Sequence, residues 1–396
     1  MRGCFDKGGD ILDLNNVIDT RRRGEPDLLL FVAIFALAGI GIAMSYSASA
    51  VIALRDYGDS FYFIKRQLVW FIIGMAALVV AQNVDYRIYA RHTKVMLLVS
   101  FLLLVAVLVP GIGTGVKGSS RWLSLGVVRF QPSEFVKLAA VIYLAKIYSA
   151  DAHDSHVIRL LVPMLVIAVI FILVLMQPDF GTAIDLLIVS VFIMFVSGFP
   201  LLYMMLLAVV SLPMFYLMIY QVSYRWDRII SYLDPWRDRY GIGYHIIQSF
   251  TAFKKGGLIG VGLGFGTQKL ARLPEPHTDF IFAVIAEEAG LIGTVSIALL
   301  FCYVFLRGVQ IAVMASDDFG RLLALALSLL ITVQAFINMG VVTGSLPTTG
   351  IPLPFISYGG SSLLTSMIAA GILLNISRYR DAAYREVSFD EVWNNE

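Results

Sequence analysis

Residues 27–51 read DLLLFVAIFALAGIGIAMSYSASAV, with Asp27 as the one charged residue. This run exceeds the roughly 18 apolar residues that a helix needs to cross a bilayer. Comparable runs recur along the chain, and we expect about ten spans. They lie near 27–51, 61–81, 94–110, 133–149, 157–176, 180–197, 199–220, 279–307, 321–344 and 358–376. The sequence therefore predicts an all-α polytopic membrane protein.

Composition and charge distribution support this prediction and orient the chain. Hydrophobic residues make up 58% of the chain and charged residues 15%, against about 25% charged residues in soluble domains. Lys and Arg near the span ends place the amino terminus inside. We expect a cytoplasmic leader (1–26), one transmembrane domain (27–378) and a cytoplasmic tail (379–396). The leader is interpreted as a topology signal and not as a cleaved secretory peptide. Membrane lipids are expected as neighbours, and nucleic acid is not expected as a partner.

Between the seventh and eighth predicted spans lies a polar segment, residues 221–277, which this topology places outside. Basic residues outnumber acidic residues in this segment. The acidic residues are Asp227, Asp234, Asp238 and Glu275, and the basic residues are Arg225, Arg228, Arg237, Arg239, Lys254, Lys255, Lys269 and Arg272. An external basic loop departs from the positive-inside trend. Binding of an anion is one explanation, and ordinary solvated loop charge is the other.

The external segment runs into LPEPHTDFIFA (273–283), where Asp279 stands at the entrance to an apolar helix. A charge at membrane depth is costly, so such residues are functional candidates. The simpler alternative is that Asp279 caps the helix, with Thr278 competing for that position. The neighbouring His277 and the preceding basic loop favour a functional carboxylate.

Three further charged positions are candidates for the same region. Glu134 and Lys137 stand three residues apart, which places them on one helix face where they can pair. The pair is either purely structural, or Lys137 also reaches a neighbouring carboxylate or a phosphate. Asp179 either caps the helix that follows it or lines a cavity. Asp185 lies two turns deeper and is expected to face the interior toward a polar partner.

Glycine-rich stretches and acidic pairs complete the candidate features. The GxGxxG pattern at 113–118 lacks a βαβ context, so a flexible turn is expected and not a dinucleotide site. The glycines at 260–266 predict backbone that bends close to the membrane surface and could offer amides to a ligand. At least one of Glu287 and Glu288 should point inward. Residues 350–362 predict an irregular hairpin at the membrane face.

Several of these segments together resemble the SEDS family (shape, elongation, division and sporulation) of integral membrane cell-wall proteins. The resemblance covers nearly the whole chain and rests on RWL at 121–123, FQPSEFVK at 130–137, QPDFGT at 177–182, YLDPW at 232–236, GYHIIQS at 243–249, LPEPHTDFIF at 273–282, EE at 287–288, NMGVVTG at 338–344 and PFISYGGSS at 354–362. Residues 234–236 and 268–270 are most similar to the division and sporulation branch, whose division member is FtsW. Residues 266–268 and Arg129 lean toward the elongation branch, RodA.

The resemblance implies a peptidoglycan glycosyltransferase that polymerises lipid II at the outer face of the bacterial cytoplasmic membrane, with the division septum as one expected location. A class B penicillin-binding protein and other division or elongation proteins are the implied partners. The reaction needs a base for the acceptor hydroxyl and positive charge for the diphosphate. The implied base is Asp279; the residues implied to bind substrate or support the site are Glu134, Lys137, Arg121, Asp179, Arg272, His277 and Ser357.

Two questions stay open from the sequence. A divalent cation, Mg²⁺ or Mn²⁺, could share the diphosphate, but no His/Asp/Glu cluster specifies a metal site. A lipid II translocase is the alternative function, because polar residues among helices also suit a path across the bilayer. The concentration of motif residues on the outer side favours the enzyme, since a translocase needs binding groups accessible from both faces.

Overall fold

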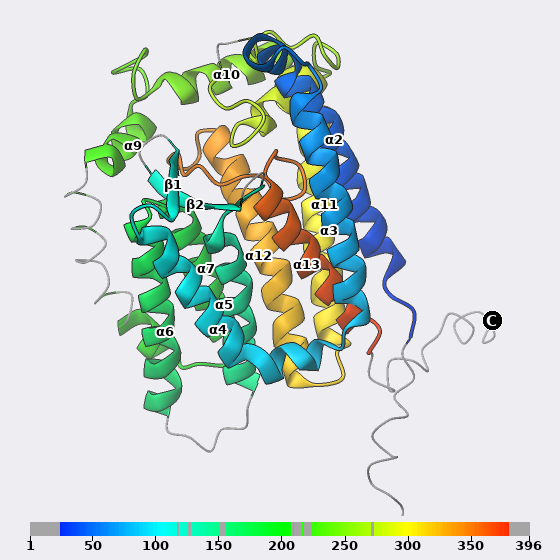
Figure 1. Ribbon diagram of the computed structural model, residues 1–396, viewed down its shortest axis with the longest axis vertical. Coiled ribbons are helices and arrows are strands. Elements are labelled where there is room, and N and C mark those ends of the chain that lie inside the picture. Colours follow the sequence, from blue (N-terminus) through cyan, green and yellow to red (C-terminus); the bar gives the residue numbers. More distant parts are fainter. Residues whose placement is uncertain are drawn as a thin grey trace, which may run out of the picture.

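The computed structural model describes residues 24–116, 119–125, 128–149, 156–206, 223–270 and 273–379, together with Val209, Tyr216 and Tyr220. Its helices are α2 (Leu28–Tyr57), α3 (Tyr62–Asn83), α4 (Tyr86–Leu108), α5 (Pro132–Ser149), α6 (His156–Met176), α7 (Phe180–Val196), α9 (Ser223–Leu233), α10 (Tyr244–Gly256), α11 (Ile281–Val313), α12 (Asp318–Val342) and α13 (Gly360–Ile376). The long helices form an upright bundle, and α9 and α10 lie across one end of it (Figure 1).

The predicted spans agree with the observed helices wherever the chain is described. Five helices (α2, α3, most of α4, α11 and α12) are long and apolar enough to cross a membrane, and α6, α7 and α13 contain shorter apolar stretches. The chain is thus an all-α polytopic membrane protein. The seventh predicted span, 199–220, lies mostly outside the described residues, as do nearly all of the leader and tail.

Aspartates fix the starts of four helices in the bundle. The side chains of Asp27, Asp85, Asp179 and Asp317 accept hydrogen bonds from backbone N–H groups in the first turns of α2, α4, α7 and α12. An N-cap aspartate satisfies donors that have no partner within the helix. Each of these four helices therefore starts at a defined residue, which is set by the aspartate before it.

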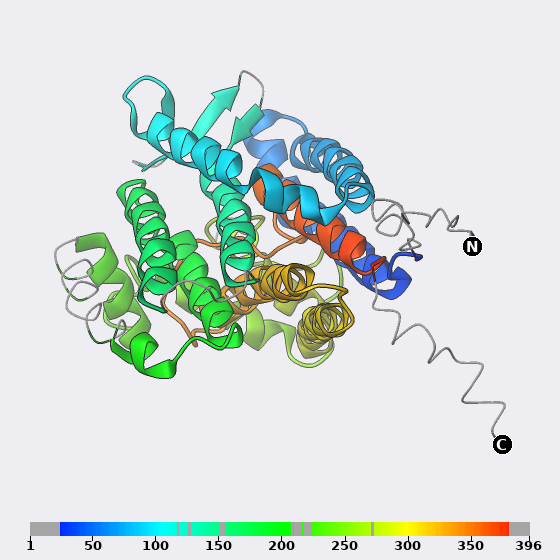
Figure 2. The ribbon, with the colours of Figure 1, turned by 90° about the horizontal axis from the view of Figure 1, so that it is seen from below.

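Helix α12 occupies the centre of the bundle. It packs against α11, α5, α7 and α13, and Figure 2 shows it in amber between these helices. Helix α3, by contrast, turns apolar side chains such as Val69, Ile72 and Val80 outward. Apolar side chains on the outside and a central helix inside are the arrangement expected of a bundle in lipid.

The loop between α4 and α5 contains a small sheet that the sequence analysis did not predict. Strands β1 (Gly113–Val116), β2 (Ser119–Leu125) and β3 (Val128–Phe130) pair antiparallel in the order β1-β2-β3. The prediction of a flexible turn was wrong for Gly113–Val116, which forms β1, with a register shift between Thr114 and Gly115. Strand β2, which contains Arg121, lies toward the same end of the bundle as α9 and α10 (Figure 1).

Helix α11 is broken at Gly290, whose backbone angles are φ 65° and ψ −161°. Four backbone hydrogen bonds between α11 and the loop after α10 close the break. The loop donates two, Val261 N to Glu287 O (3.0 Å) and Gly262 N to Glu288 O (3.0 Å), and the helix donates two, Leu291 N to Gly257 O (2.9 Å) and Ile292 N to Leu258 O (3.2 Å). Backbone groups at membrane depth need partners within the protein. The loop therefore completes the helix.

Glu287 and Glu288 both point inward, as expected of at least one of them, and both are about 1% exposed. Glu287 accepts hydrogen bonds from the Thr267 and Gln268 amides. Glu288 accepts from the Gly264 amide at 3.1 Å and from Lys269 Nζ at 2.5 Å. In the glycine-rich stretch, the Gly264 amide thus binds Glu288, and the amides of Val261 and Gly262 bind the α11 backbone, so these three have partners within the protein.

Candidate functional site

Asp279 lies in the loop before α11 and does not cap that helix. The N-cap residue of α11 is Phe280, and no side chain makes the capping hydrogen bond. The competing residue, Thr278, donates its hydroxyl to Glu275 O at 3.3 Å. The capping hypothesis, which was the main alternative to a functional carboxylate, is therefore wrong for both residues.

The backbone around Asp279 is held by the segment that follows α12 and by α12 itself. Each of three successive carbonyl groups accepts one hydrogen bond: His277 O from Tyr358 N (2.8 Å), Thr278 O from Ser357 Oγ (2.6 Å) and Asp279 O from Asn338 Nδ2 (2.8 Å). Asn338 Nδ2 also donates to Ile351 O at 2.8 Å. The carboxylate is thus carried by a backbone fixed at consecutive positions, which is how a reactive group is preorganised.

Burial and neighbouring charges set the ionisation of Asp279. Burial raises the pKa of the Asp279 carboxyl to about 6, and the negative charge of Glu275 raises it further. The cations Arg121 and Arg228 oppose this rise, while Asp179 adds to it. A carboxyl with a pKa near 6 changes charge close to neutral pH, which suits a group that accepts a proton during a reaction.

Asp179 caps α7, which was one of the two roles considered for it, and its second oxygen is hydrogen-bonded within the protein. Its Oδ1 caps α7 by accepting from Thr182 N at 3.3 Å, and its Oδ2 accepts from Gln131 Nε2 at 3.0 Å and Ser133 Oγ at 3.2 Å. Arg121 Nη1 lies 3.9 Å from Asp179 Oδ1. This network joins the ends of β3, α5 and α7 near Asp279.

Arg121 is fixed by the backbone turn that precedes α7. Its guanidinium donates from Nε to Gln177 O at 3.1 Å and from Nη2 to Pro178 O. Its side chain is 21% exposed, so a cation is held at this end of the bundle without being fully removed from solvent.

The predicted pairing of Glu134 with Lys137 is confirmed, with Lys137 Nζ 3.3 Å from Glu134 Oε2. The same ammonium lies 3.3 Å from Asp185 Oδ2 and donates to Gln334 Oε1 at 2.6 Å. Asp185 faces the interior as expected, and its polar partner is Lys137. Lys137 therefore reaches a neighbouring carboxylate, one of the alternatives considered for it, but that carboxylate is Asp185 and not Asp279.

Two further predicted site residues act on the loop through packing and hydrogen bonds. The His277 ring packs against Phe63 (centroids 4.6 Å apart) and Tyr358 (5.6 Å), and the residue is 8% exposed. Ser357 accepts a hydrogen bond from Leu353 N at 2.8 Å while donating to the loop. Arg272 lies outside the described residues.

Sequence reasoning missed Arg228, Asn338 and Gln334 as members of the site. Arg228 was noted only as part of the basic loop, although its charge acts on Asp279. Asn338 begins one of the stretches that carry the family resemblance, and a polar residue inside an apolar span was the available signal. Within the described ranges, no group of three or more His, Cys, Asp or Glu side chains is arranged to hold a metal ion.

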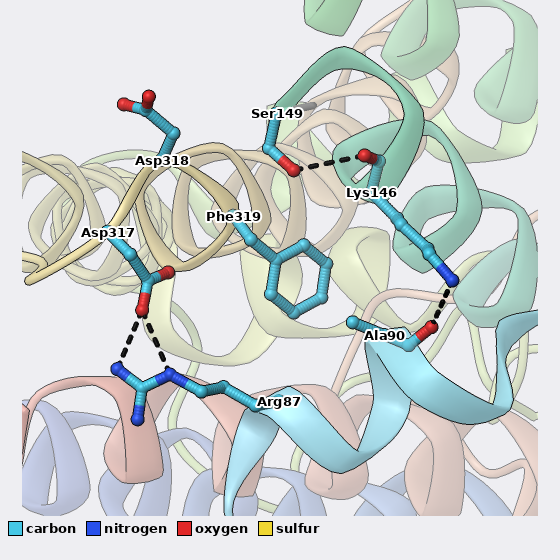
Figure 3. A pocket seen from close by; sticks show the side chains of 7 residues that line it. All are labelled: Arg87, Ala90, Lys146, Ser149, Asp317, Asp318 and Phe319. Carbon is cyan, nitrogen blue, oxygen red and sulfur yellow. Dashed lines mark hydrogen bonds and ion pairs between the residues drawn. The ribbon is translucent and has the colours of Figure 1, made fainter. Parts of the chain in front are cut away.

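The opposite end of the bundle contains an open pocket between α4, α5 and α12 (Figure 3). Its cations are engaged: Arg87 pairs with Asp317 at 2.7 Å, and Lys146 Nζ donates to Ala90 O at 2.7 Å. Asp317 precedes the start of α12, whereas Asn338 lies near its end, so the helix separates this pocket from Asp279 by about 30 Å.

Together these features define an integral membrane protein whose polar site lies at one end of a helical bundle and centres on one carboxylate flanked by arginines. The chain belongs to the family described as "Cell cycle protein", which comprises FtsW, RodA and SpoVE and matches residues 28–382.

Curated relatives agree with this family membership. The chain is 44% identical over 370 residues to "Probable peptidoglycan glycosyltransferase FtsW" of Geobacter metallireducens, covering 92% of this chain and 98% of the relative. It is 44% identical to "Stage V sporulation protein E" of Bacillus subtilis, covering 91% and 99% respectively.

Solved structures share the fold. A chain from a structure described as "Structural coordination of polymerization and crosslinking by a peptidoglycan synthase complex" aligns with a TM-score of 0.74 and 28% identity, covering 90% of this chain and 99% of that chain. The rod shape determining protein RodA of Thermus thermophilus aligns with a TM-score of 0.66 and 26% identity, covering 90% and 98%.

Proposed function

We propose that this protein is a peptidoglycan glycosyltransferase that polymerises lipid II at the outer face of the bacterial cytoplasmic membrane. The names of the FtsW relatives describe them as probable peptidoglycan glycosyltransferases. The observation that supports it most directly is Asp279, a non-capping carboxylate on a fixed loop with Arg121 and Arg228 close enough to act on its charge. A base and cations at one end of an apolar bundle suit a substrate that combines a lipid tail, a diphosphate and sugars.

The reaction joins the 4-hydroxyl of an acceptor sugar to C1 of a donor sugar whose C1 carries the lipid diphosphate. Asp279 takes the hydroxyl proton as the new C1–O bond forms, and the old C1–O bond breaks with its electron pair passing to the diphosphate. Inversion at C1 follows from attack opposite the leaving group. A base in hydrogen-bond reach of its proton contributes about 10²–10⁴-fold to such a step, and fixed cations stabilise the charge that develops on the leaving group.

A divalent cation, Mg²⁺ or Mn²⁺, remains a proposed helper for the diphosphate, and this proposal assigns no residue of the described chain to it. The substrate's own phosphate oxygens would supply hard ligands of the kind that such ions prefer. Arg121 and Arg228 provide positive charge that does not depend on it.

A class B penicillin-binding protein is the proposed partner, because one solved relative belongs to a peptidoglycan synthase complex that couples polymerization with crosslinking. The relatives named FtsW favour a role in division, at the septum and with other division proteins. Stage V sporulation protein E is the sporulation counterpart, and an elongation role like that of RodA is the remaining choice.

The test is polymerisation of lipid II by the purified protein with its cognate penicillin-binding protein. Wild-type complex should form glycan strands, and the complex carrying Asp279→Asn should not. A parallel vesicle assay should detect no transfer of lipid II between leaflets by either form. If the protein transfers lipid II between leaflets but does not polymerise it, the protein is a translocase and the proposed enzymatic function is wrong.

A further inference from the structure

Lys137, one of the cations considered for contact with a phosphate, is fully engaged inside the bundle. An ammonium has three N–H donors, and three acceptors surround Lys137: Glu134 Oε2 at 3.3 Å, Asp185 Oδ2 at 3.3 Å and Gln334 Oε1 at 2.6 Å. The residue is 1% exposed. Binding a phosphate would require Lys137 to break one of these contacts, so another cation is needed for the leaving group.

Arg228 on α9 lies where that cation is required. Its Nη1 donates to Thr348 O at 3.1 Å and to Thr349 O at 3.2 Å. These are the two residues before Gly350, whose Cα approaches Asp279 so closely that an added Cβ would lie 3.4 Å from Asp279 Oδ2. The arginine is thus bound to the segment that contacts the carboxylate.

The fixed position of Arg228 also explains its electrostatic effect. Its charge favours the ionised form of Asp279, as does that of Arg121. Arg121 belongs to the sheet and Arg228 to α9, so the two guanidinium groups approach the site from different elements. A planar guanidinium presents paired N–H donors that match phosphate oxygens, and an arginine already held by backbone carbonyls needs little reorganisation to stabilise new negative charge.

We propose that Arg228 is a substrate-binding residue that holds the diphosphate of the polyprenyl donor and stabilises it as it leaves. This inference rests on the proposed function. In the glycosyl transfer, the electron pair of the broken C1–O bond passes to the diphosphate oxygen, and Arg228 stabilises the resulting charge. The proton of the acceptor hydroxyl passes to Asp279.

Binding of undecaprenyl diphosphate in detergent micelles to the full-length protein tests the proposal. Charge-assisted hydrogen bonds of this kind predict a Kd about 10- to 100-fold weaker for Arg228→Gln, and a smaller loss for Arg228→Lys, which keeps the charge without the paired donors. Arg237→Gln is the matched control, because Arg237 is an exposed cation of the same segment. It should bind as the wild type does. Thermal unfolding of each variant verifies that the fold is retained.

A second measurement separates binding from structural support. Removing a cation that favours ionised Asp279 should raise the pKa of this carboxyl. The acid limb of the pH–activity profile should therefore move to higher pH in Arg228→Gln and stay at its wild-type pH in Arg237→Gln. Wild-type affinity for the diphosphate in folded Arg228→Gln, or equal losses in Arg228→Gln and Arg237→Gln, would overturn the proposal. If the wild-type complex binds the diphosphate through Arg228 but makes no glycan, the proposed function fails and the binding site stands. If the wild-type complex makes glycan and Arg228→Gln binds the diphosphate as tightly as the wild type does, the proposed binding site is wrong and the proposed function stands.

Discussion

Ser357 Oγ donates a 2.6 Å hydrogen bond to the carbonyl oxygen of Thr278, the residue immediately before Asp279. The hydroxyl links the segment after α12 to the loop before α11. Ser357 itself accepts from Leu353 N, so its orientation is fixed from both sides. The position of the carboxylate therefore depends on a segment more than 70 residues further along the chain.

Asp279→Asn should abolish polymerisation and leave the fold intact. Asn cannot take the proton, so we expect a loss of about 10²–10⁴-fold in the rate of glycan synthesis. Since Asp279 does not cap α11, the melting temperature in detergent at pH 7.5 should equal or exceed that of the wild type. Near-normal synthesis by the folded variant would exclude Asp279 as the base.

Activity should rise with pH through about 6, because Asp279 has a pKa raised to about 6 by burial and only its ionised form accepts a proton. The same shift has a consequence for stability with the opposite sign. A folded-state pKa above the unfolded value of about 3.9 means that the protein loses stability as pH rises from about 4 to about 6. The pH dependence of kcat/KM for the wild type, with unfolding followed over the same range, checks both statements. An activity profile that is flat between pH 5 and 7 would contradict the assignment.

The buried group of Glu134, Lys137 and Asp185 contains one cation and two carboxylates, and Asp185 Oδ1 has no hydrogen-bond partner among the described residues. Asp185→Asn keeps an acceptor for Lys137 and removes one carboxylate, so stability should be unchanged or higher. Lys137→Met leaves carboxylates uncompensated, which typically costs about 3–5 kcal/mol. Thermal unfolding in detergent compares the two variants, and equal destabilisation would show that Asp185 is needed as a charge.

Gly41 on α2 permits the close approach of the segment that carries Ser357. A Cβ at Gly41 would lie 2.4 Å from Phe355 O and 2.7 Å from Ile356 Cα, closer than atoms tolerate. Gly41→Ala should therefore displace this segment, destabilise the protein by about 1–3 kcal/mol and lower polymerisation by about 10²-fold through misplacement of Asp279.

Gly39 on the same helix is the control for this substitution, because nothing lies within 4 Å of its added Cβ. Gly39→Ala should leave the melting temperature and the rate of glycan synthesis at wild-type values. Similar effects of the two substitutions would attribute the loss to α2 itself and not to the contact with Phe355.

The Asp279 end of the bundle should face outward. Tyr240, 93% exposed in the segment between α9 and α10, should become accessible as Tyr240→Cys to a membrane-impermeant maleimide in intact spheroplasts. The background lacks Cys4 and Cys302. Arg321→Cys, at the exposed start of α12, should react only after permeabilisation. The reverse pattern would place the carboxylate in the cytoplasm.

The parts of the fold that could be predicted from sequence are those set by local pattern. Apolar runs placed the helices, and the spacing of Glu134 and Lys137 predicted their pairing, since neighbours on one helix face are determined by its period. The position of Asp279 at a helix entrance was predicted in the same way, although the start of α11 is two residues later than expected.

Contacts between distant segments could not be predicted. Asp185 meets Lys137 from another helix, and Arg228 meets Thr348 and Thr349 across more than 100 residues. Such pairs depend on how helices are arranged, which no local period encodes. The sheet of β1 to β3 was missed for a similar reason, because its strands are short and lie in a glycine-rich loop.

The break in α11 has a consequence for how the chain is made. The loop residues that close the break, 257–262, lie about 30 residues before Gly290, so they are synthesised before their partners in α11. Until Leu291 and Ile292 reach Gly257 and Leu258, the nascent helix exposes peptide groups that lipid cannot solvate. We therefore expect insertion of α11 and docking of this loop to be coupled during biogenesis.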